Sequence, residues 1–523
     1  MIVRRTLLVA ATAVVAAVTM TSPAGARPHG AAAGPTRRKA LHLAPAREQV
    51  AALRRGAVSS RDLVEEYLEH HSRVNPGLNA VVTLDPEGAR AAADKADRHL
   101  AETGKVLGPL HGLPLTVKDA LETRGMRTTC GSPGLADHVP DRDADAVARL
   151  RAAGAVIIGK TNVPTMCQDI QTSNPLFGTT KNPYAADRTA GGSSGGPAAA
   201  VAAGLTSLEV GSDLAGSLRL PAAYCGVYAL RTSFGIVPTR GHIPRPPDWL
   251  TSSDMLTLGP LARTPEDLEL LLDVLVGPAP DDAAAWQINL PAPRHSRLGD
   301  YRIGLWQDDP YCHVDKDTRA LLDTVADLVR SAGATIDDAT RPVDLADSDT
   351  LFQRLMYATA SATADNAGFA ADIEAAAKIP ADDPSGLFLH SRTMRHRDWM
   401  LANEEREKLR GRWARYFETH DVLITPAAPT AAVADQTSTP VPKRHITVDG
   451  EKRPYFAQTT WLNMTSHVKL PAVVLPAGKT ADGLPLGIQI VGPYLADRTV
   501  IDVAKHLARL LPEPVRPPAH PAR

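Results

Sequence analysis

The 523-residue sequence has few aromatic residues, few cysteines and almost no net charge. Aromatic residues make up 4% of the chain, and 57 basic side chains balance 58 acidic ones to a net charge of −1. This balance gives no electrostatic reason to expect nucleic acid or an anionic membrane as a partner. Hydrophobic and charged residues, at 44% and 22%, are in ordinary proportion for a globular protein.

The four cysteines are spread too widely to indicate a disulfide framework or a metal site. They are Cys130, Cys167, Cys225 and Cys312. Cys225 stands in an apolar run and is expected to be a buried thiol. The sequence also has no HExxH motif and no closely paired cysteines, so we expect no metal.

Long apolar runs are scarce, and the N-terminus carries the clearest one. Arg4 and Arg5 precede an uncharged run from Leu7 to Met20, and small residues follow at 24–26. This arrangement is typical of a secretory signal peptide cleaved after Ala26. An uncleaved membrane anchor is the alternative, although the run is short and only mildly apolar for that role.

The predicted organisation follows from this N-terminus. We expect a secreted or extracytoplasmic protein with no stable membrane association after cleavage, and the sequence does not indicate an oligomeric state. The expected parts are a signal peptide at 1–26, a linker at 27–45, a folded domain at 46–515 and a disordered tail at 516–523.

Helix and strand patterns alternate from residue 46 onward. A helix is predicted to begin at Ser59 or Ser60 and to stop at Asn75-Pro76-Gly77. Apolar strand patterns at 113–118, 155–162 and 205–213 are separated by helical patterns. Such alternation indicates an α/β fold in which helices cover both faces of one sheet.

A Gly-Ser loop at 191–196, "GGSSGG", is open to several interpretations. It lacks the Lys-Ser or Lys-Thr that a phosphate-binding P-loop requires. It matches the G-x-S-x-G nucleophile elbow of α/β-hydrolases around Ser193, but a loop rather than a strand precedes it. A structural linker is the third alternative, although the loop leads directly into an apolar helix pattern.

A second Gly-Ser stretch, "GSDLAGSLR" at 211–219, follows an apolar strand pattern. A tight turn there would direct the N–H groups of Leu214, Ala215, Gly216 and Ser217 into one concavity that suits an oxyanion. The Ser217 hydroxyl would then lie beside the concavity as a nucleophile.

Two charged residues, Asp213 and Arg219, flank this turn and are expected to pair and brace it. The base for a serine nucleophile is less obvious, because no histidine stands in a Gly/Ser-rich setting. Lys118 ends an apolar strand pattern, and burial there would lower its pKa enough for it to accept a proton. A salt bridge to Asp119, or a solvated strand end, is the alternative role for Lys118.

These segments, in this order, resemble the amidase signature family of serine hydrolases. The resemblance is carried by "GPLHGLPLTVKDALETRGMRTTCGS", "GKTNVP", "GGSSGGPAAAVAAG" and "GSDLAGSLRLPAAYCGVYALRTSFG", and it runs from about residue 46 to "ADGLPLGIQIVGP". It implies one domain with a large mixed sheet. It also implies a triad in which Ser217 forms the acyl-enzyme, Ser193 follows a cis peptide bond and relays the proton, and Lys118 is the base.

The sequence departs from the family pattern at three positions. Ser212 replaces the usual Thr five residues before the nucleophile, and Ala215 replaces the first Gly of a Gly-Gly pair. Ala215 is acceptable only if that position does not need a positive φ. Thr165 stands where the family often has Glu. Ser212, Leu214, Ala215 and Gly216 are the residues expected around the oxyanion and substrate.

The resemblance implies an amidase that hydrolyses a small-molecule carboxylic amide to an acid plus ammonia or amine without a cofactor. The signal-peptide pattern adds the expectation that this amidase is exported. Two alternatives remain: an esterase of the α/β-hydrolase type using Ser193, and a non-catalytic binding protein on the same scaffold. Ser466-x-x-Lys469 also matches an S-x-x-K motif, but lacks its companion motifs. His70 and His71 are expected on a solvated helix face, and Trp461 and Gln168 in a pocket or, for Trp461, in the core.

Overall fold

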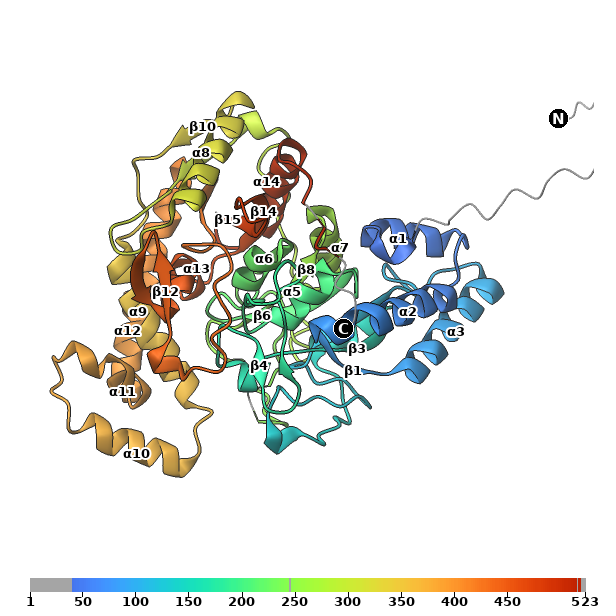
Figure 1. Cartoon of the computed structure of the whole chain (residues 1–523), viewed down its shortest axis with the longest axis horizontal. Coiled ribbons are helices and arrows are strands. Elements are labelled where there is room, and N and C mark those ends of the chain that lie inside the picture. The colour runs from blue at the N-terminus through green and yellow to red at the C-terminus, as the bar shows by residue number, and fades with distance from the viewer. Residues whose placement is uncertain (1–39, 244–245, 515, 519–523) are drawn as a thin grey trace, which may run out of the picture. The chain divides into compact units, whose positions relative to one another are not determined.

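The computed structural model describes residues 40–243, 246–514 and 516–518 (Figure 1). The predicted signal peptide lies outside these residues. A compact unit begins at Ala40, and Ala44 is buried in it. Residues 40–45 therefore belong to the folded unit rather than to the linker that was expected to reach residue 45. In the described part of the chain, no helix combines the length and the apolar character needed to cross a membrane.

The centre of the fold is an 11-stranded sheet. From one edge to the other, its strands are β1 (Val81–Leu84), β3 (Val156–Thr161), β2 (Pro114–Lys118), β6 (Leu208–Asp213), β8 (Thr257–Ala262), β7 (Tyr228–Arg231), β14 (Ala472–Lys479), β15 (Pro485–Val491), β11 (Val422–Pro426), β9 (Arg302–Leu305) and β10 (Thr335–Asp337). The mixed sheet implied by the family resemblance is confirmed.

The strand pairings explain why the sheet is mixed. β2 is parallel to both β3 and β6, and β9 is parallel to both β10 and β11. The remaining pairings are antiparallel, including β6 with β8 and β14 with β15. Parallel pairs require crossover connections, and helices supply them here. Two small ladders, β4 (Ser173–Asn174) with β5 (Gly178–Thr179) and β12 (His445–Val448) with β13 (Glu451–Pro454), stand apart from this sheet.

Helices cover both faces of the sheet, and the core residues show this directly. Neighbouring residues on a strand point to opposite faces. Ala229 and Leu261 belong to one buried cluster, whereas Leu230 and Ala262 belong to another. The first cluster contains the apolar residues of α5 (Gly195–Ala202) and α6 (Arg219–Cys225). The second contains those of α7 (Pro265–Leu275), α8 (Lys316–Ser331) and α14 (Asp497–Leu510).

The other helices surround these layers (Figure 1). They are α1 (Ala46–Arg54), α2 (Ser60–Leu78), α3 (Pro86–Thr103), α4 (Asp145–Ala152), α9 (Leu345–Ser361), α10 (Asn366–Ala376), α11 (Leu387–Arg392), α12 (His396–Thr419) and α13 (Thr460–Ser466). Ser59 caps α2 by accepting a hydrogen bond from the Asp62 N–H at 2.9 Å.

The end of α2 differs from the sequence prediction. The helix continues through Pro76 to Leu78 and is closed by Asn79 in the left-handed conformation (φ 55°). The Asn75 side chain accepts from the N–H groups of Ala80 and Val81 at 3.0 and 2.9 Å. The Asn75 side chain therefore holds the segment that follows the helix, whereas the sequence prediction placed the end of the helix at Asn75-Pro76-Gly77.

Candidate active site

Two neighbouring parallel strands bring Lys118 and Ser212 to the same edge of the sheet. Lys118 is the last residue of β2, and Ser212 and Asp213 end β6. The register pairs Val117 with Val210. Because the carboxyl ends of parallel strands meet at one edge, the predicted base and the start of the Ser217 turn lie side by side.

The Lys118 amine lies among three serine hydroxyls. Nζ is 2.7 Å from Ser193 Oγ and 2.9 Å from both Ser194 Oγ and Ser212 Oγ. An ammonium has three protons and would donate to all three hydroxyls. A neutral amine has two protons and one lone pair, so it donates to two hydroxyls and accepts from the third. The geometry therefore accommodates both protonation states of Lys118.

Burial determines which state is favoured. The Lys118 side chain is fully buried, and this burial lowers its pKa, opposed by the charges of Cys167, Cys130, Asp213 and Glu209. The alternative of a salt bridge to Asp119 does not match the structure. The Asp119 carboxylate instead accepts from the Thr129 N–H and Oγ–H, the latter at 2.6 Å.

The Gly191–Gly196 loop presents Ser193 to this lysine. The Gly192–Ser193 peptide bond is cis, which agrees with the family resemblance. A Cβ on Gly192 would lie 2.7 Å from the Asp169 carbonyl oxygen, so this position excludes any larger residue. Thr172 Oγ donates to the Gly191 carbonyl at 2.9 Å and accepts from the Gly195 N–H at 3.1 Å. The loop is therefore a fixed part of the structure and not a flexible linker.

The turn before Ser217 is organised by the Asp213 carboxylate. Its Oδ1 accepts from the Gly216 N–H at 2.9 Å, and its Oδ2 accepts from the Leu218 N–H at 3.1 Å. The expectation that the Gly216 N–H faces an oxyanion therefore differs from the structure, because its single proton is already donated. The N–H groups of Leu214, Ala215 and Ser217 have no acceptor within the described chain.

Glycine is required at one position of this turn and not at its neighbour. Gly216 has a φ of 91°, and a Cβ there would lie 2.7 Å from Leu462 Cδ1. Ala215 is not among the residues with positive φ. The replacement of the family's first glycine by Ala215 is therefore compatible with the turn.

Ser217 itself is partly exposed, whereas Ser193 is buried. The two serine loops are in direct contact, because the Ser194 N–H donates to the Ser217 carbonyl at 3.1 Å. The structure thus brings Lys118, Ser193 and the Ser217 backbone into one cluster. No histidine within the described residues donates to or accepts from Ser193 or Ser217.

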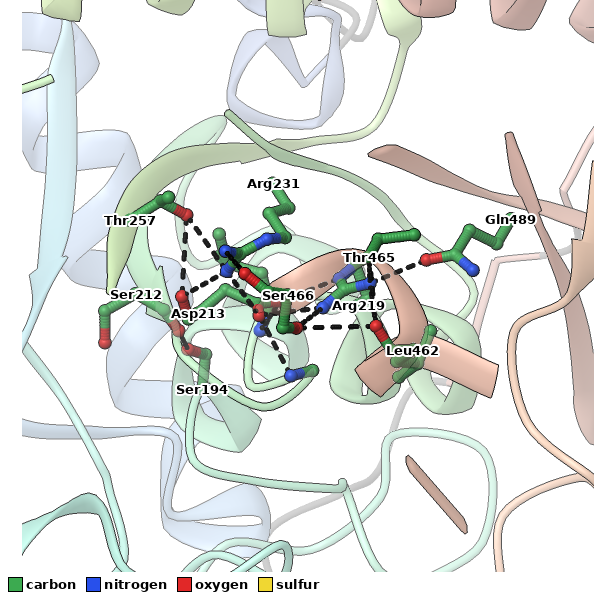
Figure 2. A network of polar contacts seen from close by, with 12 residues as sticks. Ser194, Ser212, Asp213, Arg219, Arg231, Thr257, Leu462, Thr465, Ser466 and Gln489 are labelled. Atoms are coloured by element: carbon green, nitrogen blue, oxygen red, sulfur yellow. Dashed lines mark hydrogen bonds and ion pairs between the residues drawn. The ribbon is translucent and has the colours of Figure 1, made fainter. Parts of the chain in front are cut away.

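A buried charge network supports the turn (Figure 2). Asp213, Arg219 and Arg231 are all fully buried. Arg219 donates to both Asp213 oxygens at 2.9 Å, and Arg231 donates to Oδ1 at 3.1 Å and to the Asp213 carbonyl at 2.6 Å. Burial raises the pKa of Asp213, but the Arg219 charge and hydrogen bonds outweigh it and hold that pKa well below its usual range.

The network extends to the C-terminal part of the chain. Arg219 donates to the Leu462 carbonyl and Thr465 Oγ at 2.8 Å, to Ser466 Oγ at 2.9 Å and to Gln489 Oε1 at 2.6 Å. These acceptors come from α13 and β15, which are far from the turn in sequence but adjacent to it in Figure 2.

Sequence reasoning missed three residues that contribute contacts to this cluster. Ser194 received no role, although its hydroxyl contacts Lys118; its position beside Ser193 in the glycine loop was the available signal. Arg231 and Ser466 were not connected to the site. Their contacts join distant segments, which no local pattern reveals.

The remaining candidates from the sequence have structural roles. Ser466 Oγ accepts from Arg219, while Lys469 Nζ lies 5.0 Å from the centre of the Phe234 ring, so the S-x-x-K pair does not assemble. Trp461 is fully buried, and its indole N–H donates to the Cys312 carbonyl at 3.1 Å. Gln168 is exposed. Trp461 is thus a core residue.

The prediction of a solvated face for both histidines of α2 was wrong: His70 is partly buried and bonds to the Ala203 carbonyl at 2.8 Å, and His71 lies deeper. Its side chain is buried and bonds to the Leu205 carbonyl at 2.7 Å, because that face packs on the chain following α5. Cys225 is fully buried, as predicted. Within the described ranges, no group of three or more His, Cys, Asp or Glu side chains is placed to hold a metal ion.

Comparisons with known proteins match this chain to one family model, to relatives by sequence and to solved structures. A family model described as Amidase matches residues 62–501. A glutamyl-tRNA(Gln) amidotransferase subunit of Thermosynechococcus vestitus is 32% identical over 470 residues, covering 85% of this chain and 93% of the relative. The solved structure of 6-aminohexanoate cyclic dimer hydrolase with substrate is 27% identical, with a TM-score of 0.74 over 91% of this chain and 99% of that one. A bacterial aryl acylamidase is 26% identical, with a TM-score of 0.74 over 90% and 96%.

Proposed function

Because the chain belongs to the amidase signature family, we propose that it is an exported amidase that hydrolyses a small carboxylic amide through an acyl-enzyme on Ser217. Members of this family act on carbon–nitrogen bonds as hydrolases or amidotransferases. The observation that carries the proposal is the contact of a fully buried Lys118 amine with the Ser193 hydroxyl at 2.7 Å.

The first step is activation of Ser217. Neutral Lys118 accepts a proton from Ser193, and Ser193 accepts one from Ser217 as the Ser217 oxygen attacks the amide carbon. A serine hydroxyl is a weak nucleophile at its ordinary pKa and needs such a base. Burial of Lys118 supports this role, because it lowers the pKa of the amine and so favours its uncharged form.

The negative charge on the amide oxygen is then stabilised by the turn. The N–H groups of Leu214, Ala215 and Ser217 are the donors available for this purpose, since Gly216 and Leu218 donate to Asp213. Each well-placed donor of this kind contributes about 3 kcal/mol to the transition state. Because Asp213 fixes the turn in advance, these donors need little reorganisation during the reaction.

The leaving group departs as the protons return. Lys118, now an ammonium, gives a proton back through Ser193 to the leaving nitrogen, and the carbon–nitrogen bond breaks. Water then attacks the ester on Ser217, with the same lysine and serine taking its proton. The products are a carboxylic acid and ammonia or an amine, and no cofactor takes part.

A second candidate function follows from the relatives. Several are named as a subunit of glutamyl-tRNA(Gln) amidotransferase, so the same chemistry would release ammonia for transfer within a larger assembly. The apolar run at 7–20 with Arg4 and Arg5 before it favours export instead. Expression of the whole chain with N-terminal sequencing of the extracytoplasmic protein tests this: a mature N-terminus at Arg27 supports export, and an intact Met1 in the cytoplasm favours the amidotransferase role.

Fluorophosphonate labelling followed by peptide mapping tests the nucleophile. We expect one adduct, on Ser217, which disappears in Ser217→Ala and is strongly slowed in Lys118→Ala. An adduct on Ser193 would instead support the esterase alternative. No adduct in folded protein that also hydrolyses no amide or anilide substrate would support a binding protein.

A further inference from the structure

Two of the four cysteines lie together beside the proposed catalytic centre. Cys130 Sγ and Cys167 Sγ are 3.6 Å apart, although 36 residues separate them in the chain. Both are free thiols. Cys130 lies in the loop after β2, and Cys167 ends a short 3₁₀ turn, Thr165–Cys167. The mechanism described above uses neither sulfur.

Backbone contacts hold the two thiols together. The Met166 N–H donates to the Cys130 carbonyl at 2.8 Å, and Thr165 Oγ donates to the Gly131 carbonyl at 3.2 Å. Cys130 and Cys167 also have φ angles of 48° and 56°, a conformation that residues other than glycine adopt only where the surroundings impose it. The two loops are thus fixed to each other at the sulfur pair.

The same pair is connected to the proposed catalytic residues on both sides. The Cys130 N–H donates to the carbonyl of Asp119, the neighbour of Lys118, at 2.7 Å. On the other side, the chain following Cys167 packs on the glycine before Ser193: a Cβ on Gly192 would meet the Asp169 carbonyl oxygen at 2.7 Å. A movement of Cys167 is therefore transmitted to the Ser193 loop.

The environment makes Cys167 the reactive member of the pair. Its hydrogen bond with the Cys130 thiol is the main cause that lowers the pKa of the Cys167 thiol, against the effect of burial. Burial raises the pKa of Cys130. Cys167 is also partly exposed, whereas Cys130 is fully buried. A thiolate that is accessible and close to a second thiol has the arrangement of a redox-sensitive cysteine.

We propose that Cys130 and Cys167 form a redox-sensitive dithiol, which a peroxide or a small-molecule disulfide closes to a Cys130–Cys167 disulfide, and that closure suppresses catalysis. The regulatory part of this inference rests on the proposed amidase function. The site itself does not, because disulfide formation is measured independently of any substrate.

The chemistry balances with either oxidant. With hydrogen peroxide, the Cys167 thiolate attacks one oxygen, the O–O bond breaks, and a sulfenic acid forms with release of hydroxide. The Cys130 sulfur then attacks the Cys167 sulfur, the S–O bond breaks and the disulfide forms. Over both steps, two thiols and one peroxide give one disulfide and two waters. With a small disulfide, two successive exchange steps release two thiols.

Closure must move at least one of the two sulfurs. The sulfurs approach from 3.6 Å to a bonded distance of about 2 Å. Cys130 is fully buried, and its thiol lies 3.6 Å from the Ile243 carbonyl, so Cys167 is the side that shifts. The shift is passed along the chain after Cys167 to Asp169, whose carbonyl packs on Gly192, and so displaces the Ser193 loop. A displacement of about 1 Å at a proton relay lowers the rate by about 10²-fold.

The experiment uses the whole chain, with diamide as the oxidant because it converts two neighbouring thiols to a disulfide. Non-reducing peptide mapping reports the 130–167 link, and the rate of fluorophosphonate labelling at Ser217 reports the catalytic centre. Cys130→Ser removes the second thiol without touching the proposed triad. Cys225→Ser is the matched control, since Cys225 is equally buried and its thiol donates to the Ala190 carbonyl, at 3.4 Å, rather than facing Cys130 or Cys167.

We expect a 130–167 link in the wild type, a labelling rate about 10²-fold lower after oxidation, and full recovery with a reductant. Cys130→Ser should label at the reduced wild-type rate and resist diamide, while Cys225→Ser should respond as the wild type does. If Cys130→Ser does not fold, mapping and labelling of the wild type still decide the outcome. Absence of the link overturns the site, and a link with unchanged labelling overturns the regulation. Reduced protein that forms the link but is never labelled refutes the amidase proposal and leaves the dithiol established.

Discussion

Lys118 Nζ lies 2.7 Å from Ser193 Oγ, and no part of the lysine side chain is exposed to solvent. A charged amine is costly to bury, whereas a neutral one is not. The contact therefore couples the protonation of Lys118 to the hydroxyl that we propose as the proton relay. This coupling predicts how the reaction depends on pH.

The rate should rise with pH and level off once Lys118 is neutral. Since burial lowers the pKa of Lys118 from its ordinary value of 10.5, the rising limb should lie below that value. The profile of kcat/KM against pH on a hydrolysed amide measures it. Lys118→Met should lower kcat/KM by about 10²–10⁴-fold and remove the limb. A wild-type rate that is already maximal at pH 5 would exclude Lys118 as the base.

Ser193 and Ser194 form a matched pair of neighbouring hydroxyls on the same amine, at 2.7 and 2.9 Å. We predict that Ser193→Ala lowers kcat by about 10²–10⁴-fold, because it interrupts the proton path. Ser194→Ala should lower kcat by about tenfold or less, since it removes one neutral hydrogen bond to Lys118 worth about 1 kcal/mol. Steady-state kinetics on both variants, with circular dichroism as the folding control, compare them. Equal losses would mean that Ser193 has no special role.

Removing one partner from the buried Asp213–Arg219 pair should destabilise the fold. Arg219→Met leaves the fully buried Asp213 carboxylate with fewer partners, and we expect a loss of about 3–5 kcal/mol in the free energy of unfolding. Urea denaturation at pH 7 measures it. The exposed pair Arg73–Glu69 provides the control: Arg73→Met should change the same quantity by less than about 0.5 kcal/mol. Similar small losses in both variants would contradict the role assigned to Asp213.

Substitutions at the adjacent positions 215 and 216 should differ in their effect on stability and on the labelling of Ser217. Gly216→Ala introduces a Cβ at a φ of 91° and 2.7 Å from Leu462 Cδ1, so we expect a loss of about 1–3 kcal/mol in stability together with slower labelling of Ser217. Ala215→Gly restores the family's pattern and should change stability by at most about 1 kcal/mol. Urea denaturation and fluorophosphonate labelling measure both variants. If Gly216→Ala is as stable and as reactive as wild type, the described turn is incorrect.

His71 predicts a pH dependence of stability that is separate from catalysis. Burial lowers its pKa to about 4, against about 6.5 in an unfolded chain. Between these values the unfolded state binds more protons, so stability is full above pH 6.5 and falls as the pH drops towards 4. His71→Gln should remove about 3 kcal/mol of this decline. Urea midpoints of both proteins between pH 7 and pH 4.5 test it, and parallel curves would contradict the assignment.

Local patterns in the sequence were sufficient for the strands and loops that form the site. Lys118 at the end of β2 and the turn after β6 could be predicted because apolar runs and Gly-Ser clusters are short-range signals. The α/β class and helices on both faces followed from the same alternation, while the mixed sheet came from the family resemblance.

Contacts between segments that are distant in sequence account for the features that the sequence analysis did not predict. β14 and β15 lie in the middle of the sheet, and β14 pairs with β7 although more than 200 residues separate them in the chain. The hydrophobic periodicity of a single segment does not reveal such a pairing. His71 was misplaced because the element that covers it, the chain after α5, is remote in sequence. Arg231 and Ser466 enter the site for the same reason.

Arg219 donates to acceptors in residues 462–489, so the support of the Ser217 turn is incomplete until those residues have been synthesised. When a ribosome has added Ser217, all three proposed catalytic side chains exist, yet the residues that accept from Arg219 at 462–489 have not been made. The acceptors that fix Arg219, and the strands β14 and β15, are made only after more than 200 further residues. We therefore expect a growing polypeptide that already contains Lys118, Ser193 and Ser217 to be inactive until residues 462–489 have been made and packed against Arg219.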